Sequence, residues 1–175
     1  MAFTVETGAG IAGANSYLSV PAFSAYLTDI GAAVPATGAE AALVRASAWL
    51  DGRYRSRFPG TRANGRAQGL EWPRAGAADV SGHAISATEI PVEVLNATAE
   101  AARRELASPG ALAPDAPAGG AIKRIRKKVD VLETETEYAD AGTAGGAGAP
   151  GFPLIDGIMS GLIGTGAGFP AVLVV

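Results

Sequence analysis

The sequence predicts a mainly α-helical fold, a small helical bundle with an extended β-hairpin or strand arm and an extended C-terminal arm. Amphipathic segments with capping residues recur in residues 1–110 and again after residue 152, and a β-branched, alternating segment spans 121–138. Gly- and Pro-rich linkers separate these parts. We therefore expect a helical body over 1–110, an arm over 121–138, and a terminal helix with a tail over 152–175.

The first helix is predicted over residues 19–31. Ser19 suits the N-cap position, proline is tolerated in the first turn, and Gly31 suits a left-handed C-terminal position. A second helix should begin at Thr37 and Glu40, which match the capping box, and run to about Tyr54. Its buried stripe is expected to contain Leu43, Ala46 and Leu50.

The stretch 55–84 lacks helical periodicity and contains Pro59-Gly60 and Asn64-Gly65, so it reads as an irregular, Arg-rich loop. Loops of this kind often carry function. A third helix should start near Pro91 and end at a Ser-Pro-Gly stop beginning at residue 108. Its predicted buried stripe is Val94, Leu95, Thr98, Ala102 and Leu106.

Segment 121–138 is basic in its first half and acidic in its second. A hairpin would place opposite charges across from each other, and a single long arm is equally compatible with the pattern. A short helix is predicted over 153–162, with Leu154, Ile155, Ile158, Met159 and Leu162 on one apolar face. The uncharged tail that follows, Phe169 to Val175, needs a partner, because an apolar β-prone segment is otherwise prone to aggregate.

Positive charge is confined to one part of the chain. All fourteen Lys and Arg residues fall between Arg45 and Lys128, a window with eight acidic residues and a net charge of +6, whereas the whole chain carries −3. A polyanionic partner would therefore bind within this window. Five of the cations cluster in one short run, Lys123, Arg124, Arg126, Lys127 and Lys128, which could bind phosphates or pair with the neighbouring acidic residues.

The sequence argues against an enzyme. It has no cysteine, and its single histidine, His83, stands alone in a Gly-rich loop, so no catalytic residue, metal site or cofactor is predicted. Glu133, Glu135 and Glu137 could in principle bind a cation, but a solvated or salt-bridged strand face is the better interpretation. No apolar run reaches the roughly 20 residues of a membrane span, and no secretory signal is recognised.

Aromatic residues alternate with arginines in the loop region. Tyr54, Phe58 and Trp72 could stack on the bases of a single strand, since their neighbours are cationic. Core packing is the favoured interpretation for Trp49 and Trp72.

An ordered set of motifs resembles a known family. The motifs are Ala14-Asn-Ser-Tyr17, Trp49-Leu-Asp-Gly-Arg-Tyr54, Leu70-Glu-Trp-Pro-Arg74 and Ile90-Pro-Val-Glu-Val94, followed by the basic segment from Ile122 and the terminal helix. In this order they are similar to the phage and prophage family of DnaT-like single-stranded-DNA-binding proteins. The resemblance covers almost the whole chain.

This family in turn resembles the head-to-tail adaptors, or connectors, of long-tailed phages and gene transfer agents. That resemblance implies a structural virion protein made in the host cytoplasm and located at the virion neck, where a ring of typically twelve copies joins the portal to the tail around the DNA channel. Its partners would be the portal protein, a tail-side stopper or tail-terminator protein, further copies of itself and packaged DNA, with no membrane.

Carried over residue by residue, the resemblance implies three groups of site residues. The portal-docking tail would be Phe169, Pro170, Ala171, Val172, Leu173, Val174 and Val175. The basic run from Lys123 to Lys128 would contact DNA or neighbouring subunits. Trp49, Asp51, Arg53, Tyr54, Trp72, Pro73 and Arg74 would hold the loop, with the indoles buried and Asp51 and Arg74 as anchors.

Two functions follow from these observations. The adaptor function explains the arms, the hinge glycines and the missing catalytic groups. The alternative, a DnaT-like replication accessory protein that binds single-stranded DNA through the Arg-rich loop and the basic run, explains the charged window but leaves the apolar tail without a role.

Overall fold

The computed structural model describes residues 2–113, 122–128, 133–138 and 151–163. They form two compact units, one made of residues 1–112 and 152–175 and the other of residues 113–151. The first unit contains the helices α1 (Val20–Asp29), α2 (Ala39–Tyr54), α3 (Val92–Ala107) and α4 (Pro153–Ile163). The second contains the strands β5 (Ile122–Lys128) and β6 (Glu133–Tyr138).

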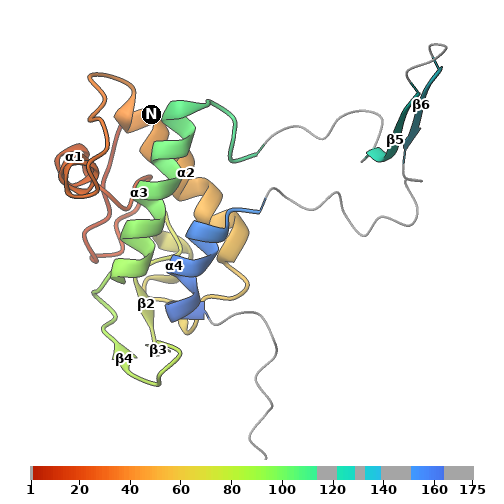
Figure 1. Ribbon diagram of the computed structural model, residues 1–175. Coiled ribbons are helices and arrows are strands. Elements are labelled where there is room, and N and C mark those ends of the chain that lie inside the picture. Colours follow the sequence, from red (N-terminus) through yellow and green to blue (C-terminus); the bar gives the residue numbers. More distant parts are fainter. Residues whose placement is uncertain (1, 114–121, 129–132, 139–150, 164–175) are drawn as a thin grey trace, which may run out of the picture. The chain divides into compact units, whose positions relative to one another are not determined.

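Helix α3 is the centre of the first unit, because it contacts each of the other three helices (Figure 1). Small residues on α3 allow this close packing: Ala97, Ala99, Ala101 and Ala102 are fully buried. The core around them is completed by large side chains, chiefly Phe23, Leu43, Leu50, Trp72, Ile155 and Met159, none of which reaches solvent. Burying this apolar surface is the main stabilising contribution to such a small domain.

The predicted helices are confirmed with small changes. Ser19 caps α1 by accepting a hydrogen bond from the N–H of Ala22, and Gly31 adopts the expected positive φ of 67°. The capping box of α2 is wrong: the N-cap is Gly38, with φ 83°, and no side chain bonds the free amides there. On α4, Leu154 is half exposed rather than part of the buried face.

The Arg-rich loop is more ordered than the sequence predicts. Two short antiparallel pairs organise it, β1 (Thr61–Arg62) with β2 (Arg74–Ala75), and β3 (Ala77–Ala78) with β4 (Ala84–Ile85). A short 3-10 helix, η1 (Gly65–Ala67), lies between β1 and β2. The described fold is therefore a small mixed domain, four helices with short antiparallel strand pairs, and the expected extended C-terminal arm lies outside the described residues.

A buried glutamate shapes the N-terminal segment. Both oxygens of the Glu6 carboxylate accept backbone hydrogen bonds of 2.7–3.0 Å, from the N–H groups of Thr7, Gly8, Gly10 and Ile11. Gly8 and Gly10 have positive φ, which other residues rarely adopt. The segment 7–11 thus curls around one carboxylate before the chain enters α1.

The second unit contains a β-hairpin. β5 pairs with β6 in antiparallel register, with a shift between Ile122 and Arg124. The hairpin, one of the two expected forms of this segment, is therefore the form that the structure describes.

Candidate nucleic-acid interface

The end of α2 is joined to the loop by a buried polar junction. Tyr17 donates its hydroxyl hydrogen to Asp51 Oδ1 (2.6 Å), and the N–H of Glu71 donates to Asp51 Oδ2 (3.0 Å). The Tyr17 oxygen in turn accepts the N–H groups of Glu71 and Trp72 at 3.1 and 3.2 Å. Burial raises the pKa of Asp51 to about 6 despite these hydrogen bonds. Burial and the adjacent carboxylate also raise the pKa of Tyr17.

Glu71 is the centre of an arginine cluster. Its carboxylate contacts Arg62 at 2.6 Å, Arg74 at 3.0 Å and Arg55 at 3.8 Å. Burial alone would raise the pKa of Glu71, but the hydrogen bond from Arg62 and the charges of the three guanidinium groups lower it below its usual value. One carboxylate thus faces three cations, and Arg55, with 61% of its side chain exposed, is the most accessible of them.

Arg74 also holds the loop backbone. Its guanidinium donates to the carbonyl oxygens of Pro59 and Gly60, both at 2.7 Å, in addition to its contact with Glu71. The Arg74 side chain is only 9% exposed. It lies over the ring of Phe58, which packs edge-on against Trp72 at a centroid distance of 5.7 Å.

The aromatic residues of the loop are not available for base stacking. Tyr54, Phe58 and Trp72 are buried, and the interpretation of Trp72 as a core residue is confirmed. Pro73 is also fully buried. Trp49 is only partly buried, at the edge of the core.

Trp49 belongs to a second cluster beside the start of α4. Its ring packs edge-on against Phe152, with centroids 5.2 Å apart, and the Arg53 guanidinium lies 5.6 Å from it. Arg53 binds Asp156 at 3.1 Å, and the Tyr54 hydroxyl donates to the same carboxylate at 2.5 Å. These contacts attach α4 to α2. The seven residues expected to hold the loop therefore divide between two places, with Trp49, Arg53 and Tyr54 on the α4 side.

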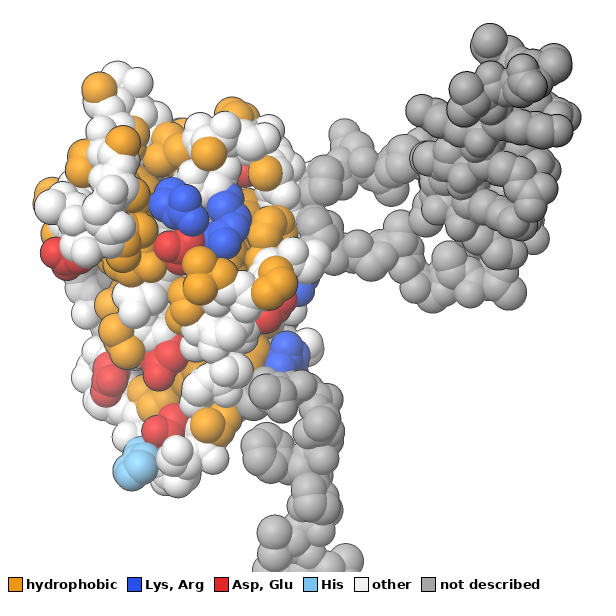
Figure 2. All heavy atoms as spheres, in the orientation of Figure 1, with side chains coloured by type: hydrophobic (Ala, Val, Ile, Leu, Met, Phe, Trp, Pro, Cys, Tyr) orange, Lys and Arg blue, Asp and Glu red, His pale blue; other side chains and the backbone are white. Residues whose placement is uncertain are grey.

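Most described arginines of the first unit are paired with acids. Arg45 binds Glu105, and Glu100 binds both Arg103 and Arg104. On the face of the molecule in Figure 2, basic side chains lie beside acidic ones over α3. Residues 2–113 and 151–163 carry nine arginines and eleven carboxylates, a net charge of −2. The positive window seen in the sequence therefore does not make this unit cationic.

The hairpin places its charges in a regular order. Arg124, Arg126 and Lys128 stand opposite Glu137, Glu135 and Glu133 in the register. Lys127 stands opposite Thr134 instead, and Lys123 lies at the register shift. Since directly opposite residues share a face of an antiparallel pair, the charged pairs occupy one face. Two cations of the basic run, Lys123 and Lys127, thus have no acidic residue across from them.

The described residues hold no cluster of three or more metal-ligating side chains of the His, Cys, Asp and Glu types. His83 is exposed in the turn between β3 and β4, where its ring lies 3.2 Å from Asp79. In the same part of the chain, no helix is both long and apolar enough to cross a membrane. The tail residues Phe169 to Val175 lie outside the described ranges.

Glu71 was missed as a site residue, although the sequence held a signal for it. It is the only acidic residue between Asp51 and Asp79, a stretch that contains six arginines. A single carboxylate among so many cations is expected to be shared by several of them.

Comparisons with known proteins place the chain in a family. No curated protein and no solved structure matches it, and no comparison points to a head-to-tail adaptor. A family model does match, over residues 1–174, and its description is "Putative DnaT-like ssDNA binding protein". Because this match spans nearly the full sequence, the chain belongs to the DnaT-like single-stranded-DNA-binding family.

Proposed function

We propose that this protein binds single-stranded DNA as a non-enzymatic accessory factor. The family match across residues 1–174 is the observation that carries the proposal. Two sets of cations can supply phosphate contacts. One is on β5, where Lys123 and Lys127 have no acid opposite them, and the other is the exposed part of the Arg-rich loop, including Arg55 and Arg66.

The mode of binding follows from which side chains are exposed. Tyr54, Phe58 and Trp72 are buried, so stacking on them does not contribute. Binding should instead depend on phosphate charge and release of counterions, with little sequence preference. Because the first unit is acidic overall, affinity should be modest, and because phosphate contacts carry the binding, affinity should fall as salt rises.

The test is fluorescence anisotropy of a labelled oligo(dT), titrated with the full chain over a range of salt concentrations. We expect saturable binding, with the logarithm of the binding constant falling linearly with the logarithm of the salt concentration. Replacing Lys123 and Lys127 together by Ser should reduce the slope by about 1.4, since each lost single-strand phosphate contact contributes about 0.7. Replacing Thr134 and Thr136 by Ser changes the same hairpin without changing charge, and should leave the slope as it is.

One result would overturn the proposal, and another would move the contact from β5 to the loop. Absence of binding at low salt would show that this chain does not have the activity its family description names. An unchanged slope in the lysine variant would mean that β5 is not part of the contact, and the arginines of the loop would then have to carry it.

A second candidate, the head-to-tail adaptor, is favoured by a specific observation. Most described arginines of the first unit already have acidic partners. In the hairpin, three cations stand opposite glutamates in the register. Paired charges of this kind suit protein assembly more than nucleic-acid binding. In that function the copies would form a ring at the virion neck and bind a portal protein. Electron microscopy of the protein mixed with portal rings tests it: an added ring of density is expected, and free portals would exclude it.

A further inference from the structure

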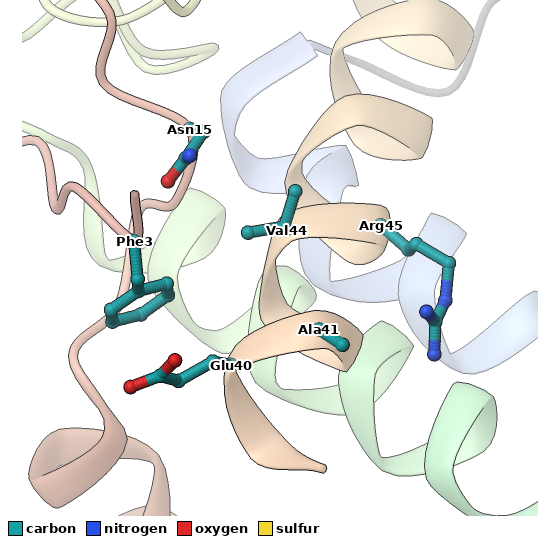
Figure 3. Close-up of a pocket in the computed structure, with 6 residues that line it drawn as sticks. All are labelled: Phe3, Asn15, Glu40, Ala41, Val44 and Arg45. Atoms are coloured by element: carbon teal, nitrogen blue, oxygen red, sulfur yellow. The ribbon is translucent and has the colours of Figure 1, made fainter. Parts of the chain in front are cut away.

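A continuous groove follows one side of α2. Three adjoining depressions make it up: the first and second share Glu40 and Ala41, and the first and third share Asn15 and Val44. Figure 3 shows its middle part, where Phe3 and Asn15 of the N-terminal segment face Glu40 and Val44 of α2 while Arg45 points away. From Gly38 to Arg55 the groove is about 25 Å long, at 1.5 Å per helical residue.

The floor of the groove is apolar and made of small residues. Ala41, Val44 and Ala48 of α2 line one side, and Gly13, Ala14 and Leu70 line the other at the Arg55 end. Gly69 is required there, because a Cβ at this position would lie 2.3 Å from the carbonyl oxygen of Ala14. Ala41 and Ala48 are exposed to solvent. Because the lining residues are small, this surface has room for the apolar side chains of an extended peptide.

The charges along the groove disfavour a nucleic acid. Two carboxylates line it, Glu40 near one end and Asp51 near the other. The three lining arginines each have an acidic partner, Glu105 for Arg45 and Glu71 for Arg55 and Arg62. A polyanion would gain little charge neutralisation here, whereas an uncharged peptide would not be repelled by the carboxylates.

The chain itself contains a segment that fits these requirements. Phe169 to Val175 has no charged side chain, and five of its seven residues are Phe, Val or Leu. It lies outside the described residues, and its sequence favours an extended conformation. Seven extended residues span about 23 Å at 3.3 Å each, which matches the length of the groove.

A second copy can supply this segment with fewer constraints than the chain itself, because α4 and the groove lie on different sides of α2. Val44, Ala48, Asp51 and Arg55 face the groove, while Trp49 and Arg53 face α4, and the two sets are about 150° apart around the helix. The connecting residues 164–168 span at most about 18 Å. Passing halfway around a helix takes about 16–19 Å, so the chain's own tail would reach the groove only with a fully extended linker. Such extension costs conformational entropy, which the tail of a second copy does not lose in its linker.

We propose that the groove along α2 binds the C-terminal segment Phe169 to Val175 of a second copy of this chain. The contact is heterologous, since a groove on one copy receives a tail from another. Many proteins bind a short extended peptide in a groove in this way, through contacts with the peptide backbone and its apolar side chains. The proposal is independent of single-strand binding.

Two variants separate the two halves of the contact. A chain ending at Gly168 keeps the groove and lacks the tail, and Ala48→Arg fills the groove and keeps the tail. Ala107→Arg, the same change at an exposed alanine of α3, serves as the control. Both alanines are exposed, so neither substitution should prevent folding, and helical circular dichroism verifies this.

Analytical ultracentrifugation gives the main readout. We expect the full chain and Ala107→Arg to self-associate with concentration, and the truncated chain and Ala48→Arg each to remain monomeric. Mixing those last two should restore a complex of one copy of each, because one supplies a free groove and the other a free tail. A fluorescent peptide of residues 164–175 should bind the truncated chain, and Ala48→Arg should weaken it at least about tenfold.

Several outcomes would overturn the proposal. Equal self-association of full and truncated chains would show that the tail is not involved. A full chain that stays monomeric, yet gains peptide binding when truncated, would place the tail in the groove of its own copy. Displacement of the peptide by oligo(dT) would assign the groove to nucleic acid instead.

Discussion

The Arg-rich loop and the hairpin both carry dense positive charge, but they balance it in different ways. In the loop, Arg55, Arg62 and Arg74 converge on one carboxylate, Glu71, and Arg74 is almost completely buried with it. In the hairpin, each of three cations stands opposite its own glutamate in the register. Charge neutralisation in the loop therefore depends on one carboxylate, Glu71, whereas the hairpin has a separate glutamate for each of three cations.

This difference decides what each region can offer to a partner. Cations that hold a loop together are already engaged by buried acceptors, and releasing them costs stability. The hairpin cations belong to a separate unit, so we expect changes in their contacts to leave the stability of the helical core unaltered. A high number of arginines in a sequence segment thus does not by itself identify an anion-binding surface, because those arginines can already be paired with acids.

The largest effect is expected when Glu71 is changed to Gln. Arg74 would be left buried without its acidic partner, and the free energy of unfolding should fall by about 3 kcal/mol, the scale for breaking a buried ion pair. Urea denaturation measures this. The matched change in the hairpin, Glu135→Gln, should alter the stability of the first unit by less than about 0.5 kcal/mol. Similar losses in both variants would abolish the distinction between the regions.

A pH titration can separate Asp51 from Glu71. The folded pKa of Asp51 is raised to about 6, so the folded state holds a proton that the unfolded state has already lost between about pH 4 and 6. Stability from Asp51 should therefore decline as pH rises through this window, by on the order of 3 kcal/mol. Glu71 acts in the opposite direction, because its lowered pKa adds stability that is lost on acidification.

The Asp51→Asn variant removes one of these two opposing titrations. The natural chain loses stability through Asp51 as pH rises from 4.5 to 7.5, and the variant does not. The unfolding free energy of the variant minus that of the natural chain should therefore be larger at pH 7.5 than at pH 4.5. Chemical denaturation at the two pH values tests this. If the difference between variant and natural chain does not change with pH, Asp51 titrates normally and the junction is more hydrated than its burial indicates.

Removing the hairpin tests whether the two regions are independent. Replacing residues 113–151 by a short Gly-Ser linker should leave the helical unit folded and raise its stability by about 1.5 kcal/mol, because a shorter loop costs less entropy to close. Thermal unfolding followed at 222 nm gives the comparison. Loss of stability on deletion would mean that the hairpin unit supports the helices.

The smallest effect belongs to Arg55. It contacts Glu71 at 3.8 Å and is largely exposed, so Arg55→Ser should cost less than about 0.5 kcal/mol. Arg103→Ser is a suitable control, since Arg103 is a partly exposed arginine on a buried glutamate, and that glutamate keeps Arg104 as a second partner. A much larger loss in Arg55→Ser would place Arg55 among the residues that hold the loop.

The sequence predicts the helices better than it predicts their connections. Ser19, Gly31 and the Ser-Pro-Gly stop give local signals that tertiary structure does not override, and α1 and α3 end close to them. The capping box failed because Gly38 takes the N-cap position with a positive φ, leaving Thr37 outside the helix. Leu154 fits the apolar stripe of α4 but is half exposed, because the stripe predicted from sequence is broader than the buried face.

The site depends on long-range contacts that no local pattern contains. Asp51 meets Tyr17 across 34 positions and Glu71 across 20. The groove along α2 arises only when the N-terminal segment folds beside it, so no local pattern predicts it. By contrast, the basic and acidic halves of residues 121–138 predict cross-strand charges if the segment forms a hairpin, and the register of β5 and β6 selects that form over a single long arm.

The Glu6 segment can also be described as a receptor that carries its own ligand. Four backbone N–H groups surround a carboxylate, the arrangement by which loops of other proteins capture free anions. In this chain the anion is covalently attached, so its local concentration is fixed and the loop does not depend on solutes. Shortening that side chain to Ala would convert residues 7–11 into a vacant receptor, and acetate in the buffer could then substitute for the missing group.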